Sequence, residues 1–258
     1  MRRPTRPLSL LFALLVIAGL AGGCPSTFQY RGIQSQFIEA TRADNQSAVD
    51  PSSADPLVQS TAAAAYPSIA AELTPERIAA LDPKLRGNAW VIRGYSQWRA
   101  GLYKDAVGSS TSGLATPGLG PRDRVLLQLL PALAVDSEAK DMWAAKKGTL
   151  TEADYPPFQE SFAEAYRTLG KAQDLIDEST APSTQYYLAY QRWRILNNWN
   201  IVIGSIDKQN ASSPARVAAR AQAEKTVGSE LSAAARAARD SIPSGVPLRQ
   251  LIKAQGGG

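Results

Sequence analysis

The feature that most constrains this chain is the lack of any strand pattern. No run of alternating β-branched residues bounded by turn-forming residues occurs after residue 24, so no β-strand is predicted there. The chain is instead rich in Ala, Leu, Arg, Glu and Gln, which favour helices. Apolar side chains recur at helical spacing, as in Phe28, Ile33 and Phe37. An all-α fold is therefore predicted.

Helix-start and helix-stop residues divide the chain further. Thr74, followed by Pro75, is typical of a helix start, and Pro67 is expected to interrupt a helix. The aromatic residues are concentrated in the segment 184–206. The predicted helices are 28–43, 62–65, 68–73, 75–82, 88–99, 107–114, 123–135, 137–147, 152 or 157 to 177, 184–206 and 214–242.

Five residues between positions 90 and 106 carry a repeat signature. A tryptophan is followed four residues later by a glycine, then by a glycine before an aromatic residue, then by an alanine three positions on. These residues are Trp90, Gly94, Gly101, Tyr103 and Ala106. All five spacings resemble those of the tetratricopeptide repeat (TPR), a helix–turn–helix unit of 34 residues. Gly94 and Ala106 would let two helices cross closely, and Gly101 would form the turn between them.

The resemblance implies a right-handed, TPR-like solenoid of stacked antiparallel helix pairs over residues 57–243. Its motifs cover only residues 74–118 of the 258 in the chain. The segment 107–114 contains Gly108 and Gly113 and lacks a large aromatic residue, so a weak or short second helix is expected. The alternative is an ordinary antiparallel helix pair joined by a glycine turn.

The first 24 residues have the three parts of an export signal. Arg2, Arg3 and Arg6 precede an apolar stretch, 8–20, that is too short to span a bilayer. Small residues then lead to Cys24, the only cysteine in the chain. This arrangement resembles the lipobox of bacterial lipoproteins, in which the cysteine is acylated. The alternative is an ordinary signal peptide, or a membrane anchor, with a cysteine that is not acylated.

The resemblance to lipoproteins implies four regions and a place in the bacterial cell envelope. They are a signal peptide (1–23), a lipid-anchored helix and tether (24–56), the helical domain (57–243) and a flexible tail (244–258). The membrane is the first expected partner, bound through acylated Cys24. Because Pro25 stands where an aspartate would retain the protein at the inner membrane, the outer membrane facing the periplasm is favoured.

Charge and composition exclude several classes of function. Loss of the leader lowers the formal net charge from +5 to +2, and no concentrated basic stripe remains, so nucleic-acid binding is not expected. Without histidine the chain can form neither a Ser-His-Asp triad nor a zinc–histidine site, and one cysteine cannot form a thiolate cluster. No metal and no cofactor are therefore expected.

A carboxylate-dependent cell-wall hydrolase is the catalytic alternative, because glycoside hydrolysis needs no histidine. Glu160 and Ser161 are similar to the Glu-Ser start of the lytic transglycosylase pattern, but the glycine-rich continuation is absent. Glu160 and Glu164 lie one helical turn apart, which is more typical of a solvated face than of a catalytic pair. The protein is therefore predicted not to be an enzyme.

The predicted function is that of a non-catalytic scaffold that binds a partner protein. The TPR resemblance places a partner-binding groove on the first helix of the repeat, at Asn88, Val91, Tyr95, Trp98 and Arg99. The alternative is a small-ligand-binding accessory lipoprotein of a transport system. In that case the aromatic helix would border a cavity beside Trp193 or Trp199, whereas a filled helix interface there would favour the scaffold.

Overall fold

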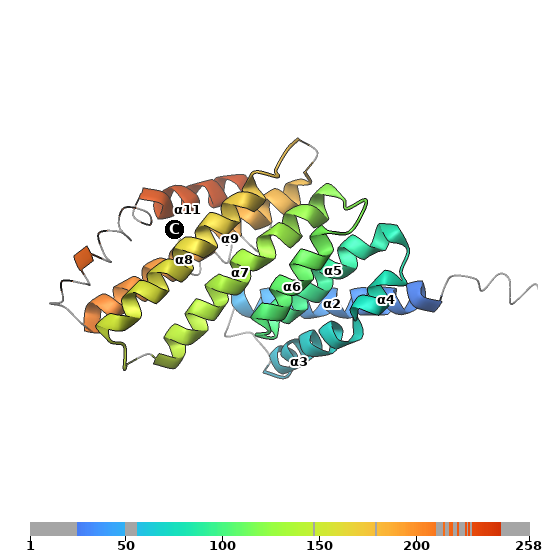
Figure 1. The fold of residues 1–258 in the computed structure, drawn as a ribbon, viewed down its shortest axis with the longest axis horizontal. Helices are drawn as coiled ribbons and strands as arrows, with labels where there is room; N and C mark the ends of the chain where they lie inside the picture. The colour runs from blue at the N-terminus through green and yellow to red at the C-terminus, as the bar shows by residue number, and fades with distance from the viewer. Residues whose placement is uncertain are drawn as a thin grey trace, which may run out of the picture.

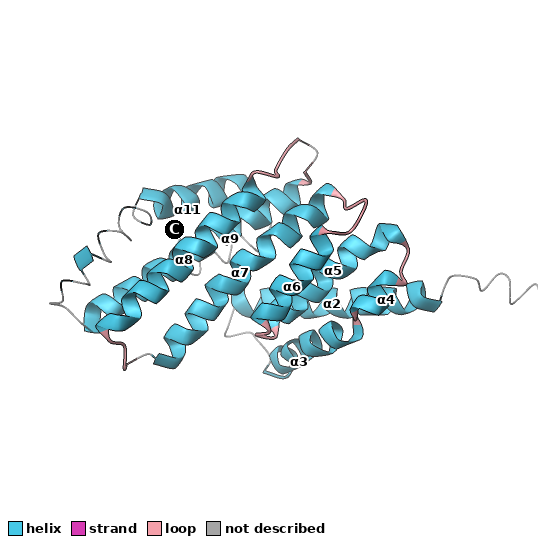
Figure 2. Ribbon diagram, in the orientation of Figure 1, coloured by secondary structure: helices cyan, strands magenta, loops and turns pink. Residues whose placement is uncertain are grey.

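The computed structural model describes residues 25–49, 56–146, 148–178, 180–209 and 229–243, with separate positions from 214 to 227. Figure 2 shows that the described regular structure is helical, which confirms the all-α prediction. In chain order the elements are α2 (Pro25–Val49), α3 (Pro56–Glu72), α4 (Pro75–Ala79), α5 (Pro83–Arg99), α6 (Tyr103–Leu114), α7 (Pro121–Lys146), the 3₁₀ turn η1 (Glu152–Asp154), α8 (Tyr155–Gln173), α9 (Pro182–Gln209) and α11 (Ser229–Ser241).

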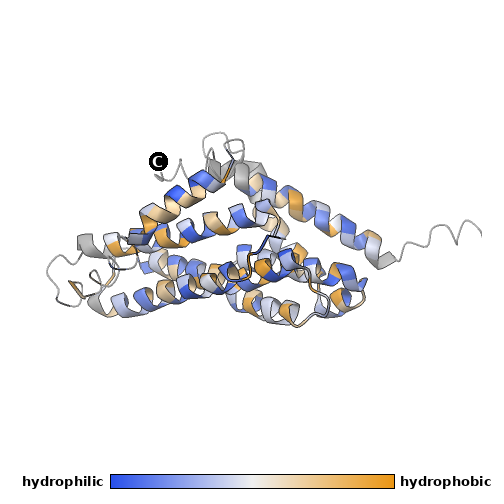
Figure 3. Cartoon of the chain, turned by 90° about the horizontal axis from the view of Figure 1, so that it is seen from above, coloured by the Kyte–Doolittle hydropathy of each residue, from blue (hydrophilic) through white to orange (hydrophobic). Residues whose placement is uncertain are grey.

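Helices α5 to α8 lie side by side in Figure 1, and each packs on the next. Each odd-numbered helix from α3 to α9 also contacts the next odd-numbered one. Helices α3, α5, α7 and α9 therefore form one row. Helix α6 packs on α5 and α7 of this row, and α8 packs on α7 and α9. Helix α2 packs mainly on α3, and Figure 3 shows it inclined to the helices beneath it.

The repeat residues lie where a close helix crossing needs them. Gly101 adopts a positive φ of 76° in the turn between α5 and α6, a conformation that suits glycine. A Cβ atom on Gly94 would lie 2.6 Å from Leu130 Cδ1, so a larger residue there would force the Leu130 side chain of α7 to move. Ala106 is fully buried and Trp90 nearly so. Gly101 therefore forms the turn between α5 and α6, and Gly94 lies where α5 packs closely against α7.

Over the predicted segment 107–114, helix α6 is unbroken by Gly108 or Gly113 and ends at Leu114; with 12 residues it is one of the shorter helices. Its small residues make room for α7. The Ser110 hydroxyl donates to the Leu127 carbonyl at 2.7 Å. That carbonyl would otherwise accept the backbone N–H of residue 131, which is Pro131 and has none. Ser110 therefore satisfies a group that the proline leaves free.

Three predicted helix boundaries also differ from those in the structure. Helix α3 continues through Pro67, whose missing N–H frees only the carbonyl of exposed Ala63. Helix α7 is a single helix where two were predicted, because Asp136 is held inside it by a distant partner. Helix α2 runs to Val49, so the start of the predicted tether is helical. Residues 1–24, 50–55 and 244–258 lie outside the described residues.

Two apolar cores fill the stack. The first extends from α2 to α9 around side chains such as Ile69, Leu127 and Leu130. The second joins α8, α9 and α11 around Phe162 and Trp199, whose rings stack at 6.3 Å between centroids. Side chains of α5, α7 and α9 take part in these cores.

Two glycines of α6 test the close approach of α6 to its neighbours. A Cβ atom on Gly113 would lie 2.9 Å from Trp90 Cβ and 2.8 Å from Leu127 Cδ1, whereas one on Gly108 would meet nothing within 4 Å. Gly108→Ala should stabilise the fold by about 0.5–1 kcal/mol through helix propensity. Gly113→Ala should destabilise it by about 1–3 kcal/mol through overpacking. Urea unfolding of both variants measures the difference, and equal midpoints would contradict this packing.

Candidate functional site

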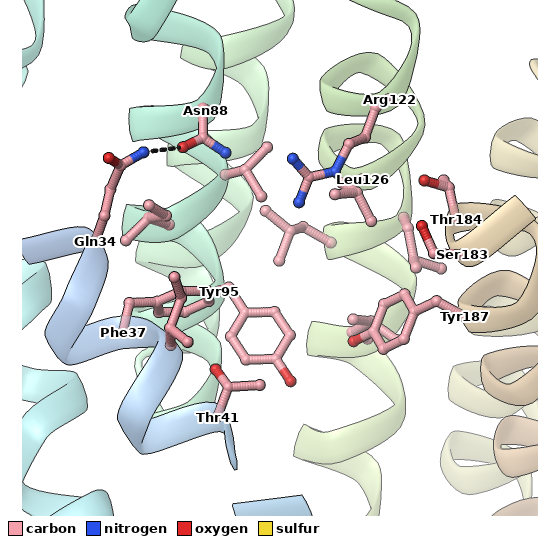
Figure 4. Close-up of a pocket in the computed structure, with 16 residues that line it drawn as sticks. Gln34, Phe37, Thr41, Asn88, Tyr95, Arg122, Leu126, Ser183, Thr184 and Tyr187 are labelled. Carbon is pink, nitrogen blue, oxygen red and sulfur yellow. Dashed lines mark hydrogen bonds between the residues drawn. The ribbon is translucent and has the colours of Figure 1, made fainter. Parts of the chain in front are cut away.

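A pocket of about 390 Å³ lies between α2, α5, α7 and α9. Figure 4 shows side chains from all four helices pointing into the same space. Its volume falls in the range of about 300–1,000 Å³ that is usual for small-molecule sites. Most of its wall is apolar, contributed by Phe37, Ile38, Val91, Ile92, Leu126, Leu129, Leu130 and Leu133.

Side-chain hydrogen bonds fix α2 across one end of the pocket. Asn88 Oδ1 accepts from the Tyr30 hydroxyl at 2.7 Å and from Gln34 Nε2 at 2.9 Å. Arg122 lies at the same end on the first turn of α7 and is exposed to solvent. Asn88 therefore holds α2 against α5 as well as lining the pocket.

A second set of contacts fixes α2 beyond the opposite end. Arg99 forms an ion pair with Asp44 at 2.8 Å, and the Tyr66 hydroxyl donates to the same carboxylate. The guanidinium group also lies 5.4 Å from the centre of the Trp98 ring. Because Asp44 is on α2 and Arg99 ends α5, this pair ties α2 to the end of α5 that is farther from Asn88.

Hydroxyl groups line the inner part of this end. Thr41, Tyr95 and Tyr187 contribute them from α2, α5 and α9 (Figure 4). The Phe37 ring packs edge-on against Tyr95 at 5.4 Å between centroids. Burial raises the pKa of Tyr95 and of Tyr187 above the ordinary tyrosine value, so both hydroxyls keep their protons at neutral pH. This end can therefore donate hydrogen bonds without carrying charge.

The structure brings together three of the five predicted groove residues. Asn88, Val91 and Tyr95 line the pocket. Trp98 is 4% exposed, and its indole N–H donates to Ser137 Oγ at 2.8 Å. Arg99 is engaged by Asp44. The predicted groove face of α5 is thus engaged by α2 at Asn88 and at Arg99, and it borders the pocket at Val91 and Tyr95 between them.

The aromatic helix is mainly core. Trp193 and Trp199 are buried, and Trp199 Nε1 donates to Gln159 Oε1 at 3.0 Å. The interface beside these two residues is filled, which is the arrangement expected for the scaffold and not for a ligand cavity at this place. The pocket lies instead at the other end of α9, beside Tyr187.

Sequence reasoning missed the contribution of α2. Gln34, Phe37, Ile38 and Thr41 recur at intervals of three or four residues, which places them on one helical face. That spacing marks a face but does not show which helix it covers. The partner helices follow more than 35 residues later in the chain.

The two carboxylates of the hydrolase alternative do not form an isolated pair. Glu160 is exposed, and Glu164 forms an ion pair with Arg167 on the next turn and accepts from the Thr168 hydroxyl at 2.9 Å. Cys24 lies outside the described residues. None of the described helices is long and apolar enough to cross a membrane.

Comparisons of this chain with models of known protein families, with curated proteins and with solved structures found no match.

Proposed function

We propose that the protein is a membrane-anchored, non-catalytic binding protein that holds a small apolar molecule between α2, α5, α7 and α9. The observation that carries this proposal is the pocket itself, a space of about 390 Å³ with a mainly apolar wall, which is within the size range of small-molecule sites. Its inner polar groups are amides and hydroxyls, which suit binding by contact and hydrogen bonding, whereas the one guanidinium, that of Arg122, lies at the solvent-exposed end. A role as an accessory protein of a transport system agrees with such a site.

The anchor is proposed to be Cys24, acylated after the leader 1–23 is removed. Helix α2 begins at Pro25, directly after this residue. The anchor would therefore hold the N-terminal end of one wall of the pocket at the membrane surface. The outer membrane, facing the periplasm, is the proposed location because residue 25 is Pro25 and not an aspartate.

A TPR-like solenoid is the proposed architecture. Two observations support it: α5 and α6 pack on each other across the turn at Gly101, and α3, α5, α7 and α9 contact one another in succession. In such a solenoid the first helix of each pair lines the concave face. The pocket would then be the part of that face that α2 leaves uncovered.

A scaffold that binds a partner protein through the same face is the second candidate. The observation that favours it is Ile38, which lines the pocket and is nevertheless 55% exposed. A partner could insert an apolar side chain beside Ile38 without displacing α2. To bind along the whole predicted groove, it would have to break the contacts of Asn88 with α2 and of Arg99 with Asp44.

Photo-cross-linking from α2 in living cells separates the two candidates. We expect p-benzoylphenylalanine in place of Ile38 to capture a small molecule, because this position borders the pocket. The same residue in place of Phe28, which is 80% exposed on the same helix, is the matched control. Intact mass of the protein reports the adduct. Capture of a protein from position 38 alone would favour the scaffold and contradict the small-ligand proposal.

A further inference from the structure

The hydroxyl end of the pocket contains polar groups that the fold does not use. The hydroxyls of Thr41 and Tyr187 are buried without a hydrogen-bond partner. Tyr66 lies beside Thr41 and Tyr95 beside Tyr187, in neither case with the geometry of a hydrogen bond. A buried hydroxyl without a partner is costly, and such groups usually serve a bound water or ligand. Figure 4 shows the Tyr187 hydroxyl directed from α9 toward Tyr95, and Thr41 on α2 at the same end of the pocket.

This end of the pocket also has no unbalanced charge. Arg99 is paired with Asp44 at 2.8 Å, and Arg194, the other guanidinium near these hydroxyls, is paired with buried Asp136 at 3.0 Å. A charged ligand group would have to lose its water here without gaining an opposite charge. An uncharged oxygen atom would lose less hydration free energy here. It could accept a hydrogen bond from the hydroxyl of Tyr187, which remains protonated.

We infer that the ligand is an uncharged, mainly hydrocarbon molecule with one oxygen acceptor, such as a ketone or an ester carbonyl. The inference rests on the proposed function and names the ligand class for the same pocket. The carbonyl oxygen accepts from the hydroxyls of Tyr187 and Thr41. The hydrocarbon body packs along α7 against Leu126, Leu130 and Leu133, and the exposed Arg122 makes no contact that the ligand needs.

Three water-soluble probes with the same ring test this inference: cyclohexanone, cyclohexanecarboxylate and cyclohexylammonium. Each is titrated against the purified full chain, and its dissociation constant is obtained from the rise in melting temperature. We expect cyclohexanone to bind most tightly. Tyr187→Phe keeps the ring and removes the hydroxyl, so it should weaken cyclohexanone binding about fivefold, the effect of one hydrogen bond. Thr41→Val should have a similar effect.

Two controls separate binding from folding. Tyr187→Phe should not lower the melting temperature of the ligand-free protein, because the lost hydroxyl has no partner in the fold. Arg122→Gln should leave cyclohexanone affinity unchanged. Tighter binding of the carboxylate that is lost in Arg122→Gln would overturn the inference, and so would equal cyclohexanone affinity in the wild type and Tyr187→Phe. No shift with any probe would instead contradict the proposed function.

Discussion

Replacing Asp136 with alanine should lower the free energy of unfolding by about 3–5 kcal/mol, because it leaves a largely buried guanidinium without its anion. Asp136 has no exposed surface, and it accepts from Arg194 Nη2 at 3.0 Å and from Asn198 Nδ2 at 3.0 and 3.1 Å. The side chain of Arg194 is only 16% exposed. Urea unfolding of the full chain, followed by tryptophan fluorescence, measures the loss.

A double variant and a surface variant make this prediction specific. Burial raises the pKa of Asp136 even though Arg194 and Asn198 favour its charged form, so desolvation is the larger effect. Removing both charges, as in Asp136→Ala with Arg194→Met, should therefore restore much of the stability lost in the single variant. Asp240→Ala removes an exposed carboxylate paired with Arg239 and should change little. Equal losses in Asp136→Ala and Asp240→Ala would contradict the buried pair.

Replacing Cys24 with alanine should abolish stable membrane attachment of the processed protein. One acyl chain binds a membrane only marginally, whereas the two chains of a diacylglyceryl group hold a protein stably. Without Cys24 neither chain can be added. The variant should then remain as an uncleaved precursor held by its leader, or become soluble where another peptidase cuts it.

Intact mass of the wild-type protein, extracted in detergent, is the measurement for the anchor. The proposal predicts a chain that begins at Cys24 and carries the mass of its acyl groups. Cys24→Ser is a useful second variant, because it preserves the size of the side chain while removing the sulfur that is acylated. A free thiol on Cys24, or a chain that still begins at Met1, would show that the leader has been misread.

Local rules predicted the elements of the fold well. Gly101 has the positive φ that its place between two helical patterns demands, and Gly94 stands at a close crossing. Local sequence rules failed where contacts with residues far away in the chain determine the structure. The sequence around Asp136 reads as a break between two helices, yet Arg194 and Asn198 hold this carboxylate inside a continuous α7. No pattern near position 136 contains that information.

The site was predictable only in part, for a similar reason. The TPR spacing located Asn88, Val91 and Tyr95 on one face of α5, and these three residues do line the pocket. The same spacing could not show that α2 lies across that face or that α9 contributes Tyr187. Both facts depend on tertiary packing between helices that are far apart in the sequence. The spacing of Gln34 and Thr41 shows only that they share one face of α2. It does not show which helices that face contacts.

The most direct test of the central claim, that the pocket is the binding site, is to repeat the cross-linking from position 38 with the pocket filled. Val91 lies inside the pocket and is 6% exposed, whereas Leu102 is 45% exposed in the turn before α6. Val91→Phe should abolish the small-molecule adduct, and Leu102→Phe should leave it intact, with both variants keeping the helical circular dichroism of the wild type. An adduct of unchanged yield in folded Val91→Phe would contradict the claim.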